Sequence, residues 1–234
     1  MMGPHYLSRF FTPKTVAIVG ASEREDSVGY RLLLNMQEAG FSGGLYPVNN
    51  KRDSLLGLKA YPDLLSVPDD LDLVVIATPA ATVPGIVRQC GEKNVTSIII
   101  ITAGFGELGD EGKRLQQEVL DIAHRYSIRI IGPNCLGVIR PSGYLNATFG
   151  DGVVKDGNLA LLSQSGAVCT AILDWAKAQD IGFSTVVSMG GAADIDFGEV
   201  LDYLATDSKT TGILMYVEGI RDARLFFKRF KSRR

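Results

Sequence analysis

Short apolar runs alternate with amphipathic segments along most of the chain, and this alternation constrains the fold more than any other feature. The runs are rich in Val and Ile, as in the DLVVIA of Asp72–Ala77, and their hydrophobicity is continuous. Continuous hydrophobicity indicates strands that are buried on both faces. Strands separated by helices favour right-handed crossovers, so the sequence predicts an α/β protein with a parallel, doubly wound sheet.

The first series of these runs predicts a Rossmann-like domain over residues 8–150. Strands are expected at Lys14–Val19, Gly43–Val48, Asp72–Ala77, Ser97–Thr102 and Arg129–Ile131, and helices at Val28–Ala39, Thr82–Lys93 and Asp110–Tyr126. Because the strands are parallel, their carboxyl ends meet at one edge, where open α/β sheets bind ligands.

A second series begins after Gly150–Gly157, a linker rich in Gly and Asp, and predicts another domain over residues 157–234. Its strands are expected at Leu159–Leu162, Ser184–Ser188 and Gly212–Val217, and its helices at Ala167–Ala178, Phe197–Ala205 and Ala223–Arg229. Three parallel strands leave an open edge and bare apolar faces. We therefore expect this domain to be incomplete and the chain to associate, as a homo- or hetero-oligomer.

Composition and charge exclude several classes of function. Hydrophobic residues make up 46% of the chain and its net charge is −2, so neither disorder nor nucleic-acid binding is expected, and the basic residues of 221–234 fit a solvated helix face. Cys90, Cys135 and Cys169 are far apart and indicate no metal site and no disulfide framework. The longest apolar run, Val95–Ala103, is shorter than the roughly 20 residues that span a bilayer. The expected location is the cytoplasm.

The turn after the first strand has the small residues of an anion site. Gly20, Ala21 and Ser22 end that strand and Gly29 follows in the next helix, so backbone N–H groups could approach a phosphate. A tight turn without a ligand explains the same residues equally well. The dinucleotide fingerprint GxGxxG is absent, which weakens the case for NAD.

The end of the second strand lacks the carboxylate that holds the ribose in NAD sites. It has Asn49, Asn50, Lys51 and Arg52 instead. Amide and cationic groups favour a ligand with an extra ribose phosphate, which is NADP or coenzyme A. A Lys-Arg pair on a surface loop remains the plain alternative.

Further loops follow strands at the same edge. In the first domain they contain Thr78, Pro79, Thr102, Ala103, Gly104, Asn134 and Cys135. A lone cysteine in such a loop is more often a packing residue than a nucleophile. In the second domain Ser165 and Gly166 begin a helix, where they form either a phosphate cradle or an ordinary N-cap.

Taken together, four motifs resemble the NDP-forming acyl-CoA synthetase superfamily, which includes the succinyl-CoA synthetase α subunit and the ADP-forming acetyl-CoA synthetases. They are GAS at Gly20–Ser22, ITAGFGELGDEG at Ile101–Gly112, GPNCLG at Gly132–Gly137 and SQSGAV at Ser163–Val168. The superfamily also includes protein-lysine acetyltransferases with a fused synthetase-like region. Three later stretches are similar to that branch: Ala171–Ala176, Asp202–Thr210 and Tyr216–Arg224.

The resemblance implies a CoA-binding Rossmann-like domain followed by a flavodoxin-like domain of the succinyl-CoA synthetase type. It implies that Gly20, Ala21, Ser22 and Gly29 meet the CoA pyrophosphate and that Lys51, with Asn49 in the same loop, faces the ribose phosphate. Thr78, Pro79, Thr102, Ala103 and Gly104 would line the adenosine and pantetheine path, with Asn134 and Cys135 near the thiol. Ser165 and Gly166 would hold a phosphate carried on a histidine, which Glu218 would orient.

The chain departs from the family pattern in the residues that move phosphate. The family histidine lies beyond the end of this sequence, which contains only His5 and His124. The ATP-grasp domain that binds ADP or ATP with Mg²⁺ is also absent, so those ligands would require a partner chain or a missing domain. The loop Gly190–Asp194 differs from the Gly-Asn-Lys loop of synthetases.

Three functions fit these observations. The leading one is the CoA- or acyl-CoA-binding part of an acyl-CoA synthetase-like protein that works with an ATP-grasp subunit. The second is a non-catalytic module that senses acyl-CoA for a lysine acetyltransferase. The third, an NADP-binding oxidoreductase, is permitted by Lys51 and Arg52 but disfavoured by the missing fingerprint.

Overall fold

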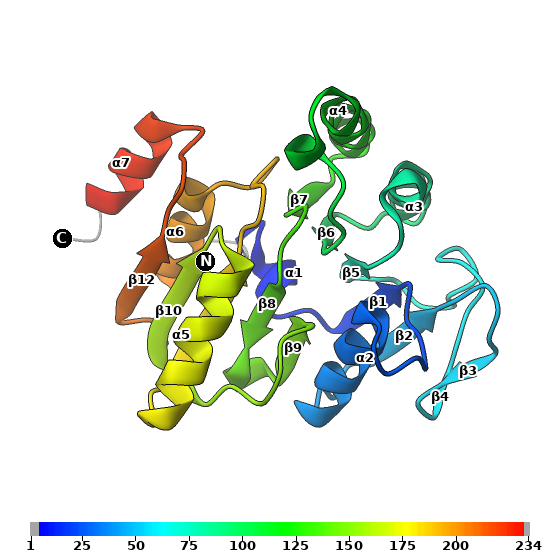
Figure 1. Cartoon of the computed structure of the whole chain (residues 1–234), viewed down its shortest axis with the longest axis horizontal. Helices are drawn as coiled ribbons and strands as arrows, with labels where there is room; N and C mark the ends of the chain where they lie inside the picture. Colours follow the sequence, from blue (N-terminus) through cyan, green and yellow to red (C-terminus); the bar gives the residue numbers. More distant parts are fainter. Residues whose placement is uncertain (1–4, 232–234) are drawn as a thin grey trace.

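The computed structural model describes residues 5–231, whose strands form two five-stranded sheets and one small hairpin (Figure 1). The first sheet has the order β2-β1-β5-β6-β7 and is parallel throughout. Its strands are β1 (Thr15–Val19), β2 (Gly44–Val48), β5 (Leu73–Ile76), β6 (Ser97–Ile100) and β7 (Arg129–Ile131). This confirms the Rossmann-like doubly wound sheet.

Helices cover both faces of the first sheet because its strands are apolar on both sides. Helices α3 (Val83–Glu92) and α4 (Asp110–Arg125) share one core with the sheet, to which Val87 and Ile122 belong together with strand residues such as Val74. Helix α2 (Val28–Glu38) packs on the other face and shares the second core with the short helix α1 (Ser8–Phe11).

The second sheet has the order β12-β10-β11-β8-β9. The parallel strands β10 (Asp156–Ser163), β11 (Phe183–Ser188) and β12 (Gly212–Tyr216) were expected. Strands β8 (Gly137–Arg140) and β9 (Leu145–Thr148) were not, and β8 runs antiparallel to β11. Across the described residues the sheet therefore has five strands rather than the predicted three. Residues 137–148, which the prediction counted with the first domain, pair with the second sheet.

The missed strands do not read as buried strands because polar side chains occupy them. Arg140, Asn146 and Thr148 are all buried, with exposed fractions of 6% or less. The sequence analysis also missed α1 and four short elements: β3 (Ser54–Leu55), β4 (Leu58–Lys59) and the 3-10 turns η1 (Ala80–Thr82) and η2 (Gly106–Leu108). A further 3-10 turn, η3 (Pro141–Gly143), joins β8 to β9.

The helices of the second unit are α5 (Gly166–Ala178), α6 (Phe197–Thr206) and α7 (Ala223–Lys231), close to the predicted bounds. Figure 1 shows α5 in front of the second sheet and α6 behind it. Along residues 5–231, no helix combines the length and the apolar character needed to cross a membrane.

A segment of the second unit covers the β7 edge of the first sheet. Gly191 N–H donates to Pro133 O (2.8 Å), Ala193 N–H to Gly132 O (3.0 Å) and Ile195 N–H to Ile130 O (3.1 Å). We call residues 191–195 the bridging segment. The Asp194 carboxylate reinforces it by accepting from Arg129 Nε (2.9 Å) and from Ile130 N–H (2.7 Å). These contacts join the two sheets side by side.

Candidate functional site

The turn between β1 and α2 requires glycine at two positions. Gly20 has φ +92°, and a Cβ there would lie 2.7 Å from Ala77 O. A Cβ on Gly29 would lie 1.9 Å from Gly20 O. Because the first turn of α2 approaches the end of β1 this closely, the N–H groups of the helix start lie beside the sheet edge. The Ser27 hydroxyl caps α2 by accepting from Tyr30 N–H at 3.2 Å.

A cavity of about 400 Å³ opens at this edge, between the ends of β1 and β2 and the start of α3. It lies where the strand order reverses, with β1 between β2 and β5, which is the usual ligand position in open α/β sheets. Of the predicted site residues it is lined by Gly20, Asn49, Lys51, Thr78 and Pro79. Among its other lining residues are Pro62, Asp63, Thr82, Ile86 and Gln89, which the sequence analysis missed.

Two of the missed residues add polar character to the cavity. Hydrogen bonds from the Ser66 hydroxyl and backbone N–H hold the pKa of Asp63 below its usual value, so Asp63 is a carboxylate at neutral pH. The Gln89 Oε1 atom accepts from Leu64 N–H at 3.3 Å. These residues come from the loop before β5 and from α3, and no spacing in the sequence connects them to Gly20.

Asn49 and Thr102 hold backbone in place at the predicted site. The Asn49 side chain donates to Ala21 O (2.8 Å) and accepts from Lys51 N–H (2.8 Å). Thr102 Oγ1 donates to Thr78 O at 2.7 Å. Asn49 therefore ties the glycine turn to the Lys51 loop, and Thr102 ties the ends of β5 and β6 together.

Close contacts continue this edge from the first sheet into the second. Asn134 N–H donates to Thr102 O (3.0 Å), and a Cβ on Gly190 would lie 2.4 Å from Asn134 O. Met189 N–H, next to Gly190, donates to Ser163 O at 2.7 Å. The predicted residues of both units thus lie along one row.

Cys135 lies in this row, but its thiol faces the core. The residue is 4% exposed and its Sγ donates to Ile100 O at 3.4 Å. Burial raises the pKa of the Cys135 thiol to about 12, so the thiol is protonated at neutral pH. The geometry matches the packing interpretation of this cysteine.

The second unit brings Ser165 and Glu218 to adjacent strand ends. The Ser165 hydroxyl caps α5 by accepting from Val168 N–H (3.3 Å), and a Cβ on Gly166 would meet no described atom within 4 Å. Because β10 and β12 are parallel neighbours, Ser163 pairs with Tyr216, two residues before Glu218. Gln164 Oε1 accepts from Glu218 N–H at 2.6 Å and from Gly219 N–H at 2.9 Å.

Two families match successive parts of the chain. The CoA binding domain family matches residues 14–141, and the succinyl-CoA ligase like flavodoxin domain family matches residues 156–233. The chain belongs to the NDP-forming acyl-CoA synthetase superfamily. Its two units are thereby assigned as a CoA-binding domain and a flavodoxin-like domain of the succinyl-CoA ligase type.

Known relatives agree with this membership. The chain is 44% identical over 226 residues to the ADP-forming acetate–CoA ligase I of Archaeoglobus fulgidus, covering 97% of this chain and 33% of the ligase. It is 43% identical to the ADP-forming acetate–CoA ligase I subunit alpha of Pyrococcus furiosus, covering 95% of this chain and 49% of the subunit. A solved acetyl-coenzyme A synthetase 1 from Ca. Korarchaeum cryptofilum, in complex with phosphate and ADP, has a TM-score of 0.92 and 40% identity over 95% of this chain and 48% of that one.

The chain spans one third to one half of the length of these relatives. More distant structures share the fold alone: ATP citrate lyase from Methanothrix soehngenii has a TM-score of 0.66 at 15% identity. The relatives named here at 40% identity or more are CoA ligases or synthetases, which leaves the acetyltransferase and oxidoreductase alternatives without support.

Neither His5 nor His124 lies in the strand-end loops that carry Ser165 and Glu218. His124 is exposed in the last turn of α4. His5 precedes α1, where its Nδ1 accepts from Leu7 N–H and its Nε2 is 3.5 Å from Asp202 Oδ2 on α6.

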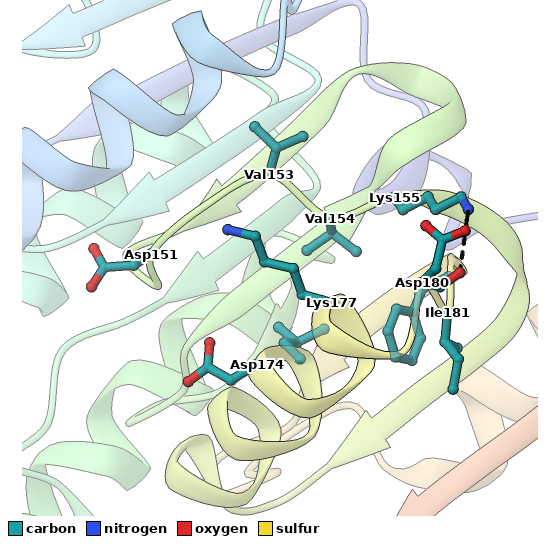
Figure 2. A pocket seen from close by; sticks show the side chains of 10 residues that line it. Asp151, Val153, Val154, Lys155, Asp174, Lys177, Asp180 and Ile181 are labelled. Atoms are coloured by element: carbon teal, nitrogen blue, oxygen red, sulfur yellow. Dashed lines mark hydrogen bonds and ion pairs between the residues drawn. The ribbon is translucent and has the colours of Figure 1, made fainter.

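A second hollow, of about 100 Å³, lies between the linker before β10 and the C-terminal half of α5. Figure 2 shows the side chains that line it. Lys155 Nζ and Asp180 Oδ2 form an ion pair across one end of it at 2.6 Å. None of the predicted site residues lines this hollow. The predicted residues lie instead along the row at the carboxyl ends of the strands.

Proposed function

We propose that the chain is the CoA- or acyl-CoA-binding part of an NDP-forming acyl-CoA synthetase. In the intact system the reaction is acyl-CoA + ADP + phosphate ⇌ acid + CoA + ATP. The observation that supports this most directly is the 400 Å³ cavity between Gly20 and Lys51, at the switch point of a CoA-binding domain. The two relatives named as acetate–CoA ligases favour acetate as the acid.

Within the cavity we assign roles by chemistry. Next to the cavity, Gly29 packs the start of α2 tightly on Gly20, and we assign the CoA pyrophosphate to the backbone N–H groups of this helix start. The Lys51 ammonium, exposed at the cavity rim, is placed to pair with the ribose 3′-phosphate. The apolar atoms of Pro79, Pro62 and Ile86 form a surface for the adenosine. The Asn49 side chain bonds to the backbone of both Ala21 and Lys51, and so holds the glycine turn next to the Lys51 loop.

The remaining predicted residues extend toward the second unit. Thr102, Ala103 and Gly104 line the pantetheine path, and the backbone of Asn134 and Cys135 lies near the thiol. The Ser165–Gly166 helix start is open to a phosphate, because a side chain on Gly166 would meet no described atom. Glu218, at the neighbouring strand end, is the carboxylate placed to orient a phosphohistidine.

The phosphate-carrying histidine and the nucleotide site are proposed to come from another part of the system. Subunit alpha in the name of the Pyrococcus furiosus relative indicates that such ligases are divided among chains, so an ATP-grasp subunit is the partner we propose. It would bind ADP or ATP with Mg²⁺. Three free, buried and separated cysteines fit a reducing compartment, and we propose the cytoplasm.

Isothermal titration calorimetry with CoA, 3′-dephospho-CoA and NADPH tests the proposal. We expect CoA to bind, 3′-dephospho-CoA to bind about tenfold more weakly through the loss of one charge-assisted contact, and NADPH to give no heat. A folded chain that binds NADPH in preference to CoA, or that binds neither, would refute the proposed function.

A further inference from the structure

The loop that carries Glu218 is held from two sides. On the side of α5, Gln164 Oε1 accepts hydrogen bonds from the N–H groups of both Glu218 and Gly219, at 2.6 and 2.9 Å. Gln164 N–H in turn donates to Tyr216 O at 3.1 Å, at the end of β12. One side chain next to Ser165 therefore fixes the backbone on which the Glu218 carboxylate is mounted.

On the opposite side, Arg221 attaches the same loop to the bridging segment. Its guanidinium donates to two successive carbonyls, Ala193 O and Asp194 O, the second at 2.6 Å. Its backbone N–H donates to Asp196 Oδ2 at 2.9 Å. Because the planar guanidinium spans both carbonyls, it fixes orientation as well as distance, which an ammonium group cannot do.

The bridging segment is itself bonded to the loop at the CoA end of the site. Gly191 and Ala193 donate to Pro133 O and Gly132 O, directly before Asn134. A Cβ on Gly190 would clash with Asn134 O at 2.4 Å, so the two backbones are in contact. A displacement of the Asn134 backbone would therefore reach Arg221 through one short segment.

We propose that Arg221 is a positioning residue that couples the Gly132–Cys135 loop to Glu218, with Gln164 holding the other side of the Glu218 loop. The importance of Glu218 rests on the proposed function. The coupling itself consists of the hydrogen bonds that join the Gly132–Cys135 loop to the bridging segment, and the bridging segment to Arg221. Occupancy by CoA at Asn134 is expected to change the local stability of the Glu218 loop through Arg221.

Amide hydrogen exchange of Glu218 and Gly219, measured by NMR on the ¹⁵N-labelled chain, tests both attachments. Without ligand, Q164L is expected to speed exchange of both amides by about tenfold, because it removes their acceptor, and Q164E to restore protection. R221Q is expected to speed exchange by several-fold. R224Q, which removes the same charge three residues later in α7, is the matched control and leaves exchange unchanged.

The second arm adds CoA and separates coupling from simple structural support. In the wild-type chain, CoA is expected to slow exchange of the two amides. In R221Q, calorimetry is expected to give a CoA affinity within about twofold of wild type, while the effect of CoA on the amides is lost. R221K keeps the charge without the fork and is expected to behave like R221Q.

Each contrary result has a definite meaning. A CoA effect of full size in R221Q, or bound CoA without any effect on the wild-type amides, would overturn the coupling. Unchanged exchange in ligand-free Q164L and R221Q would overturn the attachments themselves. A wild-type chain that fails to bind CoA would refute the proposed function, whereas the ligand-free exchange rates still decide whether Gln164 and Arg221 hold the loop.

Discussion

The two sheets present strand ends at one edge, but they build their sites differently. In the first sheet, Gly29 packs the start of α2 against Gly20, and the cavity next to this turn is lined by Gly20 and by residues of the loops that follow β2 and β5. In the second, the side chains of Gln164 and Arg221 hold the loop that carries Glu218. From this comparison we expect substitutions in the first unit to change CoA binding, and substitutions in the second unit to change the backbone around Glu218.

The largest expected effect contrasts two glycines at equivalent helix starts. G29A places a Cβ 1.9 Å from Gly20 O, whereas G166A places one in open space. We expect G29A to destabilise the chain by about 3 kcal/mol and to weaken CoA binding by more than about 100-fold. G166A is expected to leave both unchanged. Urea unfolding measures the stability of G29A and G166A, and calorimetry measures their CoA affinity. Equal effects of the two variants would contradict the difference we infer between the two helix starts.

The next effect concerns a buried ion pair of the second sheet. Arg140 donates to both carboxylate oxygens of Asp207 at 2.7 Å, and the side chains are 7% and 8% exposed. D207N leaves a buried charge without its partner and is expected to cost about 3 kcal/mol in urea unfolding at pH 7. D180N, which breaks an exposed pair with Lys155, is the control and is expected to cost under about 0.5 kcal/mol.

The same carboxylate predicts acid sensitivity. Burial alone would raise the pKa of Asp207, but hydrogen bonds from Arg140 and Thr210 lower it to about 2. A carboxylate with a lowered folded-state pKa stabilises the fold above its unfolded pKa of about 4, and this contribution is lost as pH falls toward about 2. D207N is expected to flatten the stability profile between those values. An unchanged profile would remove Asp207 as its cause.

A cation at the cavity rim gives a smaller, ligand-specific effect. K51Q is expected to weaken CoA binding about tenfold while changing the affinity for 3′-dephospho-CoA less than twofold. R52Q is the matched control, because Arg52 is the neighbouring residue but does not line the cavity. If K51Q lost the same affinity for CoA and for 3′-dephospho-CoA, Lys51 would contact the pyrophosphate or hold the conformation of its loop, and would not contact the 3′-phosphate. A loss for CoA alone would place recognition of the 3′-phosphate in the first unit, and so would distinguish the first sheet from the second.

Sequence patterns predicted the parts of the molecule that local chemistry determines. The five strands of the first sheet were placed within two residues at each end, because their Val and Ile content is continuous. Strands β8 and β9 were missed because they contain Arg140 and Asn146, polar residues that interrupt the apolar pattern although both are buried in the structure. The partner that makes Arg140 tolerable inside, Asp207, lies 67 residues further along the chain.

For the candidate site too, the sequence indicated the residues that directly follow strands but not those that come from elsewhere in the chain. Gly20 and Lys51 follow strands and were placed at the cavity, whereas Asp63 and Gln89 reach it from a loop and a helix that carry no motif. Asn49 lines the cavity, and its side chain bonds backbone on both sides, which only the structure reveals. Tertiary contacts of this kind depend on packing that no local spacing records.

The smallest effect compares two serines that cap helices: Ser27 at α2, after β1, and Ser165 at α5, after β10. Ser27 accepts from Tyr30 N–H at 3.2 Å and Ser165 from Val168 N–H at 3.3 Å, so S27A and S165A are each expected to cost about 1 kcal/mol in urea unfolding. Only S27A lies at the helix start that we propose for the CoA pyrophosphate, and we expect it to weaken CoA binding about threefold. S165A is expected to leave CoA affinity unchanged in calorimetry. A loss of CoA affinity in S165A would show that the two sheet edges bind as one unit, because the contacts through Asn134 and Met189 would then transmit the change.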